Sequence, residues 1–299
     1  MLNDASSLIA LGAFGSDPGS LSAEVYLPHS FKKNGPLVVV LHGSTQSAAS
    51  YDAGSGWSAL ADDLGITLLF PGQRRTNNPL GSFNWFKQSD NHRGGGEPMS
   101  IAQMIRLVAN EHSIDPTRIF ITGMSSGGAM TSVMLATYPE LFAGGAIIAG
   151  LPYRSANSLV QALCRMRGFG GPSDRKLERL VRDATDFDGP WPIISVWHGD
   201  NDKTVASSNA RAIVHQWRKI HQAKALSMES SQGPGSTRRV WSDQSGRDVI
   251  EEIIVHGMGH GTPLGTAGKE GLGKEGKYML EVGISSTRRI AEFWGLARA

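Results

Sequence analysis

The sequence has a single cysteine, little net charge and no long apolar run, and each shortage excludes a class of protein. Because Cys164 is alone among 299 residues, the chain cannot form an internal disulfide and is compatible with a reducing compartment. A net charge of +2 is too small to indicate a nucleic-acid partner. No run approaches the roughly 18 apolar residues of a membrane-spanning helix, so no membrane partner is expected.

Targeting and metal-binding signatures are also missing. Residues 1–10 lack the basic start and the apolar segment of a secretory signal, and the compartment stays open. No cluster of His, Cys or acidic residues has metal-ligand spacing, so neither a metal nor another cofactor is expected. What the chain has instead is glycine: 37 of 299 residues, against roughly 7% in average chains. Such an excess suits a fold with many tight turns between strands and helices.

Short apolar runs alternate with helical patterns along the chain. Six runs have the continuous apolar character of strands buried on both faces of a parallel sheet. They are Leu37–Leu41, Ile66–Phe70, Arg118–Ile121, Ala146–Ala149, Ile193–Trp197 and Ile250–Val255. Antiparallel edge strands are expected at Val25–Leu27 and Arg239–Trp241, and helices at 98–112, Met130–Tyr138, 206–221 and around Ile290. The alternation predicts an α/β fold with a mostly parallel, doubly wound sheet and helices on both faces, in one domain spanning 1–299.

Four segments depart from this rhythm. Residues 71–97 predict a long loop of the kind that tends to be functional; its Trp85 is expected to form an apolar wall of the cleft, or else to anchor the loop. Residues 150–190, rich in Arg and Lys, predict a small helical insertion that is a solvated face, an interaction surface or a lid. Residues 222–238 and 262–277 are polar and rich in glycine and predict exposed loops.

A nucleophile motif lies in the middle of the chain. Residues 119–129 read Ile-Phe-Ile-Thr-Gly-Met-Ser-Ser-Gly-Gly-Ala, a short strand followed by a Gly-x-Ser-x-Gly turn and the start of a helix. In that context Gly123 and Gly127 allow a turn so tight that Ser125 stands exposed above the sheet. An incidental tight turn is the alternative. The motif predicts that Ser125 is a catalytic nucleophile.

A nucleophilic serine needs a histidine to accept its proton and a carboxylate to orient that histidine. The apolar run Ile193–Trp197 leads into two candidate carboxylates, Asp200 and Asp202. Asp200 follows the turn glycine and is expected to brace its own loop through an Asx-type bond. Asp202 lies further out along the loop. We therefore favour Asp202 as the catalytic carboxylate.

Two histidines follow the run Ile250–Val255. His260 lies between two glycines, in a flexible setting that can bring its ring over Ser125. His256 lies at the end of the strand, where a packed structural histidine is the more common finding. The glycines between them do not sustain a helix, which argues against a metal-binding pair. His260 is thus the predicted general base.

Acyl transfer also requires two backbone N–H groups directed at the developing oxyanion. One is expected from Ser126, directly after the nucleophile. The other is expected from the loop after the strand at 37–41, where Ser44 is the first choice and Thr45 the second. His42 in the same loop is interpreted as a side chain that shapes the turn, in preference to a catalytic role.

Together these segments resemble the polyhydroxybutyrate depolymerase family of esterases, which is related to feruloyl and acetylxylan esterases. The resemblance covers most of the chain and is carried by Phe14–Gly19, Leu41–Gln46, Phe83–Phe86, Gly123–Met130, His198–Val205 and Gly257–His260. It implies an α/β-hydrolase fold. By resemblance, Ser125, Asp202 and His260 match the family triad, and Ser44 and Ser126 match its oxyanion positions.

The chain departs from the family pattern at several positions. Ser44 and Ser82 occupy positions where relatives commonly have cysteines that look like a disulfide pair, and Ser155 replaces another frequent cysteine. These replacements weaken the inference, usual for this family, that the protein is secreted. Residues 261–264 differ from the family's usual run after the histidine. No extra domain for gripping insoluble polymer is recognisable, which argues against activity on solid granules.

The function expected from these residues is cofactor-independent hydrolysis of carboxylic esters through a Ser-His-Asp triad and an acyl-enzyme. The expected substrate is a small or oligomeric short-chain ester such as a hydroxyalkanoate oligomer. Alternatives are a feruloyl or acetylxylan type of esterase, an acyltransferase or peptidase with the same triad, and a non-catalytic binding relative. The sequence leaves the oligomeric state undetermined.

Overall fold

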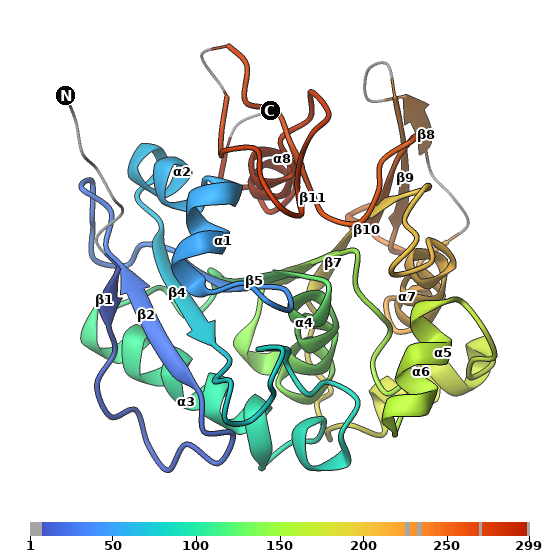
Figure 1. Cartoon of the computed structure of the whole chain (residues 1–299), viewed down its shortest axis with the longest axis horizontal. Helices are drawn as coiled ribbons and strands as arrows, with labels where there is room; N and C mark the ends of the chain where they lie inside the picture. Colours follow the sequence, from blue (N-terminus) through green and yellow to red (C-terminus); the bar gives the residue numbers. More distant parts are fainter. Residues whose placement is uncertain (1–7, 225–227, 232–234, 269–270, 298–299) are drawn as a thin grey trace.

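A ten-stranded sheet forms the centre of the computed structural model, which describes residues 8–224, 228–231, 235–268 and 271–297. The strand order is β1-β2-β4-β3-β5-β6-β7-β10-β9-β8 (Figure 1). The parallel strands are β3 (Leu37–Leu41), β4 (Thr67–Gly72), β5 (Ile119–Met124), β6 (Gly144–Ile148), β7 (Ile193–Gly199) and β10 (Asp248–Val255). Almost every residue of these strands is buried, as expected of parallel strands covered on both faces.

Antiparallel strands complete the sheet at its two edges. They are β1 (Ile9–Ala10) and β2 (Ser22–Tyr26) at one edge, and β9 (Ser236–Ser242) and β8 (Met228–Ser231) at the other. The expected edge strands are confirmed. The prediction of an exposed loop at 222–238 is wrong for β8 and the start of β9, because backbone pairing with a neighbouring strand does not depend on an apolar side-chain pattern.

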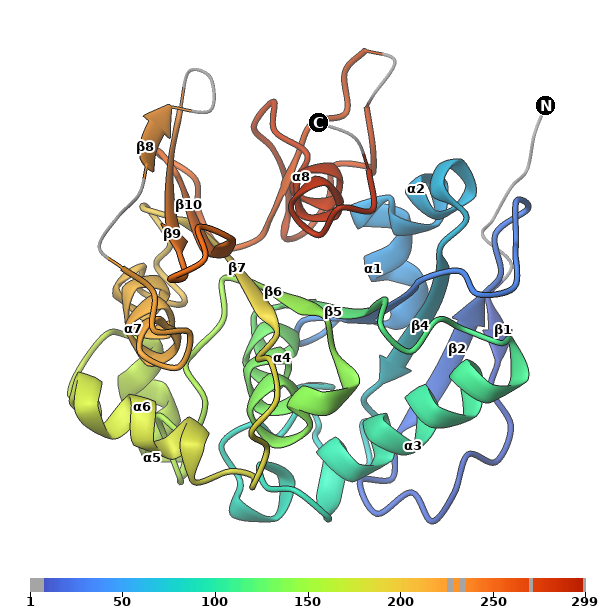
Figure 2. The ribbon, with the colours of Figure 1, turned by 180° about the vertical axis from the view of Figure 1, so that it is seen from behind.

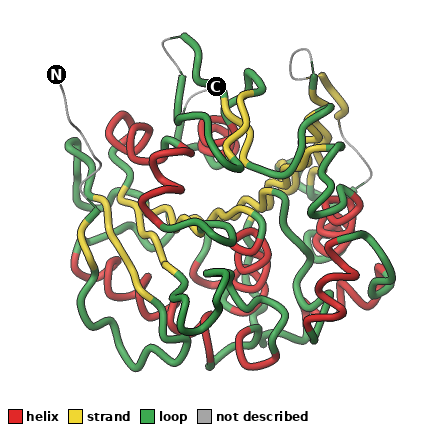
Figure 3. The backbone as a smooth tube through the Cα atoms, viewed as in Figure 1, coloured by secondary structure: helices red, strands yellow, loops and turns green. Residues whose placement is uncertain are grey.

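Helices cover both faces of the sheet (Figures 2 and 3). One face carries α1 (Ala48–Ser55), α2 (Trp57–Leu64) and α8 (Ser286–Phe293). The other carries α3 (Gly96–Glu111), α4 (Ser126–Thr137) and α7 (Ser208–Arg218), with α5 (Leu159–Met166) and α6 (Asp174–Arg182) beside α7. Two short 3₁₀ turns, η1 (Gln88–Asp90) and η2 (Pro139–Leu141), complete the helical elements of the described residues. The predicted α/β fold with helices on both faces is confirmed.

A second, two-stranded sheet pairs β11 (Thr262–Leu264) with β12 (Met279–Glu281). The residues of β11 are buried, so the prediction of an exposed loop at 262–277 is wrong at its start. Thr262 is fixed by the hydroxyl of Tyr51 at 3.2 Å, and the carbonyl of Pro263 accepts a hydrogen bond from Ser286 at 2.9 Å. This sheet therefore anchors the chain two residues beyond His260.

The predicted helical insertion at 150–190 contains α5 and α6, between β6 and β7. Helix α5 projects Leu159, Val160 and Leu163 into solvent, and Cys164 on the same helix is exposed. No helix in the described ranges is long and apolar enough to cross a membrane.

Candidate active site

The loop between β5 and α4 holds Ser125 in a strained backbone conformation. Its φ of 57° and ψ of −115° lie in a region that non-glycine residues rarely adopt, and its N–H donates to the carbonyl of Ile148 at 2.9 Å. The flanking glycines are sterically required: a Cβ on Gly127 would lie 2.4 Å from the carbonyl oxygen of Leu41, and one on Gly123 would lie 2.5 Å from backbone atoms of Gly127. The turn thus presents Ser125 beside the carboxyl end of β3.

One chain of hydrogen bonds joins the three residues predicted as a triad. His260 Nε2 lies 2.9 Å from Ser125 Oγ, and His260 Nδ1 lies 2.6 Å from Asp202 Oδ2. The residues come from the carboxyl ends of β5, β7 and β10, which the parallel sheet brings to one edge. The side chain of Asp202 is fully buried and that of His260 is 8% exposed. The geometry places a hydroxyl, an imidazole and a carboxylate in the order that a nucleophile, its base and an orienting carboxylate require.

The carboxylate of Asp202 accepts further hydrogen bonds in addition to its bond with His260. Its Oδ1 accepts the N–H groups of Thr204 and Val205, both at 2.8 Å. The fully buried His198, which the sequence analysis did not single out, donates from Nε2 to the carbonyl of Val205 at 2.8 Å and lies 3.4 Å from Asp202 Oδ2. Burial alone would raise the pKa of Asp202, but the donors, His198 foremost, hold that pKa well below its usual range. Asp202 is therefore ionised at neutral pH.

The other two candidates, Asp200 and His256, form a separate pair. Asp200 Oδ2 lies 2.9 Å from His256 Nδ1, and Asp200 Oδ1 accepts the N–H of Gly257 at 2.7 Å. The main contacts of Asp200 are therefore with the loop after β10, and not the Asx-type bond expected within its own loop. Strands β7 and β10 are neighbours in the sheet, so the loops that follow them lie together. The prediction of a packed His256 is also wrong: its side chain is 51% exposed and its Nε2 lies 3.0 Å from Thr237 Oγ1.

Two backbone N–H groups remain available near Ser125. The N–H of Thr45, the second choice as an oxyanion donor, already donates to the carbonyl of Leu80 at 2.7 Å. The N–H groups of Ser44 and Ser126 have no acceptor within the described part of the chain. The two residues lie together, with their hydroxyl oxygens 3.3 Å apart. This arrangement favours Ser44 over Thr45 as the partner of Ser126.

A buried carboxyl group, missed by the sequence analysis, fastens the 71–97 loop. Glu97 is 1% exposed and accepts from Gln73 Nε2 at 2.5 Å and from the N–H and Nδ2 of Asn84 at 2.9 and 2.7 Å. Burial raises the pKa of Glu97 to about 8. Trp85, which directly follows Asn84, is 4% exposed and packs edge-on against Phe86. Within the described ranges no hydrogen bond or ring contact joins Trp85 to the predicted triad, so its place in the substrate cleft stays a prediction.

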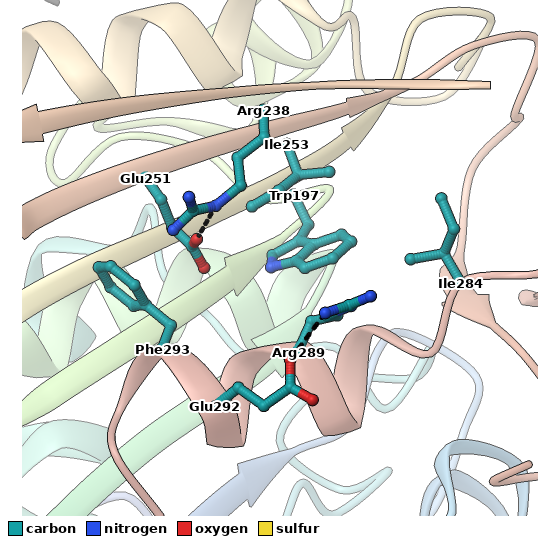
Figure 4. Close-up of a pocket in the computed structure, with 8 residues that line it drawn as sticks. All are labelled: Trp197, Arg238, Glu251, Ile253, Ile284, Arg289, Glu292 and Phe293. Carbon is teal, nitrogen blue, oxygen red and sulfur yellow. Dashed lines mark hydrogen bonds and ion pairs between the residues drawn. The ribbon is translucent and has the colours of Figure 1, made fainter. Parts of the chain in front are cut away.

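A cavity of about 230 Å³ lies elsewhere, between β7, β9, β10 and α8 (Figure 4). It is lined by Trp197, Arg238, Glu251, Ile253, Ile284, Arg289, Glu292 and Phe293. Its charged groups are paired: Arg238 with Glu251 at 2.8 Å and Arg289 with Glu292 at 3.0 Å. None of the predicted triad lines this cavity. Across the described residues, no group of three His, Cys, Asp or Glu side chains is placed to hold a metal ion.

Comparison with known proteins places this chain in a family. The family described as esterase PHB depolymerase matches residues 21–239. The chain belongs to this esterase family. Poly(3-hydroxyalkanoate) depolymerase C from Paucimonas lemoignei is 40% identical over 97% of this chain and 70% of its own length. The acetylxylan esterase of Coprinopsis cinerea is 32% identical over 87% and 70%. As a member of the PHB depolymerase family, the protein is a carboxylic ester hydrolase.

Solved structures give the same fold. The acetyl xylan esterase from Aspergillus awamori superimposes with a TM-score of 0.81 over 97% of this chain and all of its own, at 22% identity. LpqC, a poly(3-hydroxybutyrate) depolymerase from Bordetella parapertussis, superimposes with a TM-score of 0.55 over 85% of each chain, at 17% identity. At these identities the likeness concerns the fold, which is that of the α/β-hydrolases, as the sequence predicted.

Proposed function

We propose that this esterase cleaves short-chain carboxylic esters through an acyl-enzyme on Ser125. The observation that carries the proposal is the hydrogen-bond chain from Ser125 Oγ through His260 to Asp202, with both distances below 3 Å. The strained backbone at Ser125 supports it, since such strain concentrates at functional sites. So does the buried, ionised Asp202, which stabilises the imidazolium that forms when His260 takes a proton.

The reaction follows from these positions in two halves. His260 Nε2 takes the proton of Ser125 as its Oγ attacks the ester carbonyl, and then delivers that proton to the departing alkoxide. This leaves the acyl group on Ser125. In the second half His260 deprotonates a water molecule that attacks the acyl-enzyme, and then returns that proton to Ser125 Oγ as the bond to the acyl group breaks and the acid is released. The N–H groups of Ser44 and Ser126 stabilise the oxyanion in both halves.

The substrate class we propose is hydroxyalkanoate oligomers, with Trp85 as an apolar wall of the cleft. The 40% identity to a protein named poly(3-hydroxyalkanoate) depolymerase C supports this choice. Cleavage of acetyl groups from xylan is the second candidate, supported by the 32% identity to an acetylxylan esterase. Both substrates are carboxylic esters, and the same triad chemistry cleaves either.

Hydrolysis of p-nitrophenyl esters from acetate to palmitate, beside Ser125→Ala, tests the reaction. We expect turnover to peak at acetate or butyrate and to be lost in the variant. Trimers of 3-hydroxybutyrate, acetylated xylan and methyl ferulate then separate the substrate classes by kcat/KM. Preference for xylan acetate over the trimers would replace the proposed substrate, while turnover that survives in Ser125→Ala would remove the proposed mechanism.

A further inference from the structure

The cavity of about 230 Å³ between the sheet and α8 has a floor made by one row of side chains across three strands (Figure 4). The strand registers pair Trp197 of β7 with Ile253 of β10, and Ile253 with Arg238 of β9, so the three side chains lie on the same face of the sheet. Trp197 and Ile253 are buried, and the side chain of Arg238 is 19% exposed. The sheet therefore contributes two apolar groups and one guanidinium group to the cavity.

A network of hydrogen bonds on the same face fixes the position of Arg238. Trp197 Nε1 donates to Ser195 Oγ at 2.9 Å, and Ser195 Oγ donates to Glu251 Oε1 at 2.7 Å. Arg238 Nε donates to Glu251 Oε2 at 2.8 Å, so both oxygens of the buried Glu251 are occupied. Within the described part of the chain, Nη1 and Nη2 of Arg238 have no acceptor. The network therefore holds the guanidinium group in place and leaves its two terminal nitrogens available to another acceptor.

Helix α8 and the segment before it form the opposite side of the cavity. Phe293 and Ile284 add apolar surface there, and Arg289 adds a second guanidinium group. Arg289 Nη1 donates to Glu292 Oε2 at 3.0 Å, one turn further along the helix. Among the described residues, Nε and Nη2 of Arg289 have no acceptor, and the side chain is 52% exposed. The half-exposed side chain indicates that solvent reaches the cavity at Arg289.

The hydrogen-bonding groups that remain unused in the cavity are mostly donors. Over the described ranges, the charged side chains of the lining leave four guanidinium nitrogens and one carboxylate oxygen, Glu292 Oε1, without a hydrogen bond. A guanidinium group binds a carboxylate through two parallel hydrogen bonds. Half of the lining residues are apolar, so the complementary ligand also has an apolar part. An apolar cavity of about 150 Å³ accommodates benzene, so the volume here suits a ligand of about six to ten non-hydrogen atoms.

We propose that this cavity is a binding site for a short aliphatic carboxylic acid, separate from the predicted triad. The carboxylate accepts hydrogen bonds from Arg238 and Arg289, and the aliphatic chain packs against Trp197 and Phe293. Acids of this class are what a carboxylic ester hydrolase releases, so the esterase meets them wherever it works. The inference goes beyond the proposed function and does not use the assignment of Ser125 as the nucleophile.

The indole N–H signal of Trp197 gives a local readout in a ¹H–¹⁵N spectrum, once its loss in Trp197→Phe has identified it. Hexanoate should shift this signal to saturation, with a dissociation constant on the order of 1 mM. Two control ligands separate the parts of hexanoate: 1-hexanol has the chain without the charge, and inorganic phosphate has the charge without the chain. Each should bind at least about tenfold more weakly than hexanoate. Equal binding of either control ligand would overturn the proposed ligand class.

Two substitutions test the cavity itself. Arg289→Gln should weaken hexanoate binding about 5- to 20-fold, and Ile284→Phe, which fills the cavity, should abolish it. The matched control is Arg211→Gln: Arg211 is an exposed arginine on α7, which covers the other face of the sheet, and its loss should leave the affinity unchanged. If Ile284→Phe does not fold, Arg289→Gln decides.

Treatment of the wild type with diethyl p-nitrophenyl phosphate, which blocks the catalytic serine of esterases, separates this site from the catalytic cleft. The treated protein should bind hexanoate with unchanged affinity. No saturable shift up to about 20 mM hexanoate, unchanged affinity in Arg289→Gln, or loss of binding after the treatment would overturn the inference. Turnover that survives in Ser125→Ala would instead count against the proposed function alone.

Discussion

Two Asp–His pairs lie side by side at the same edge of the sheet, and they differ in burial. In each, an aspartate from the loop after β7 faces Nδ1 of a histidine from the loop after β10: Asp202 with His260 at 2.6 Å and Asp200 with His256 at 2.9 Å. Each Nε2 faces a hydroxyl, at 2.9 Å for Ser125 and 3.0 Å for Thr237. The side chains of the first pair are 0% and 8% exposed, and those of the second pair are 41% and 51% exposed.

Both pairs have hydroxyl, imidazole and carboxylate in order, so that order alone does not distinguish the pair that we propose as catalytic. Solvent screens the interaction between Asp200 and His256, and exposed pairs of this kind contribute little to the free energy of unfolding. Ser125 lies on a strained turn at the start of α4, with N–H groups of Ser44 and Ser126 beside it. Thr237 lies within strand β9, whose N–H groups are committed to the sheet. Burial and the N–H groups that we propose as oxyanion donors therefore distinguish the pair that we propose as catalytic.

The largest difference in kcat is expected between the variants that remove the two hydroxyl groups, Ser125→Ala and Thr237→Ala. Ser125→Ala should lower kcat by about 10⁴-fold or more, because the covalent route is removed. Thr237→Ala should leave kcat within about twofold. Steady-state hydrolysis of p-nitrophenyl butyrate, with circular dichroism as the check on folding, measures both. A comparable loss in Thr237→Ala would contradict the distinction drawn here.

The two carboxylates should differ nearly as much. Asp202→Asn should lower kcat by about 10³- to 10⁴-fold, because an amide no longer selects the productive His260 tautomer or stabilises its charged form. Asp200→Asn should keep kcat within about threefold and change the free energy of unfolding by less than about 1 kcal/mol. Kinetics and urea denaturation of the two variants test this. Similar kinetics in both would show that burial is not the deciding property.

Glu97 extends the comparison to a buried carboxyl group outside the predicted triad. Its pKa is raised to about 8, so the folded protein keeps its proton over a range in which the unfolded chain releases it. The wild type should therefore lose stability as pH rises from about 4.5 towards 8, by roughly 3 kcal/mol at pH 7. Glu97→Gln should lack this slope. Urea denaturation at pH 5 and pH 8 measures it, and parallel changes in both proteins would contradict the prediction.

The smallest effect is expected at His256. His256→Gln keeps a polar side chain near Asp200 and Thr237 but removes the ring. Because the pair is half-exposed, we expect a loss of less than about 1 kcal/mol in the free energy of unfolding and kcat within about twofold. Urea denaturation and esterase kinetics provide the two readouts. A loss above tenfold in kcat would mean that this pair holds the His260 loop in place.

The parts of the site that the sequence predicted are those set by local patterns. The glycines around Ser125 identify its turn, and the ends of β7 and β10 bring Asp202 and His260 to that edge, as expected of parallel strands. The helix-strand alternation likewise predicted the sheet. These inferences needed only spacing along the chain.

The parts that could not be predicted depend on contacts between distant segments. Glu97 is buried because Asn84 and Gln73 cover its oxygens, and an acidic residue near a helix start ordinarily predicts exposure. The contact of His198 with Asp202 spans only four residues, but its orientation depends on how the loop folds back. His256 follows an apolar strand, which suggested burial, whereas its side chain points into solvent.

The most direct test of the central claim is to find which hydroxyl reacts. Incubation with diethyl p-nitrophenyl phosphate, followed by digestion and mass spectrometry, maps the phosphorylated residue while released p-nitrophenol counts the sites. We predict one equivalent of p-nitrophenol, a diethylphosphoryl group on Ser125 and parallel loss of esterase activity. Labelling of Thr237 or another residue, or full activity with Ser125 modified, would contradict the assignment of Ser125 as the nucleophile.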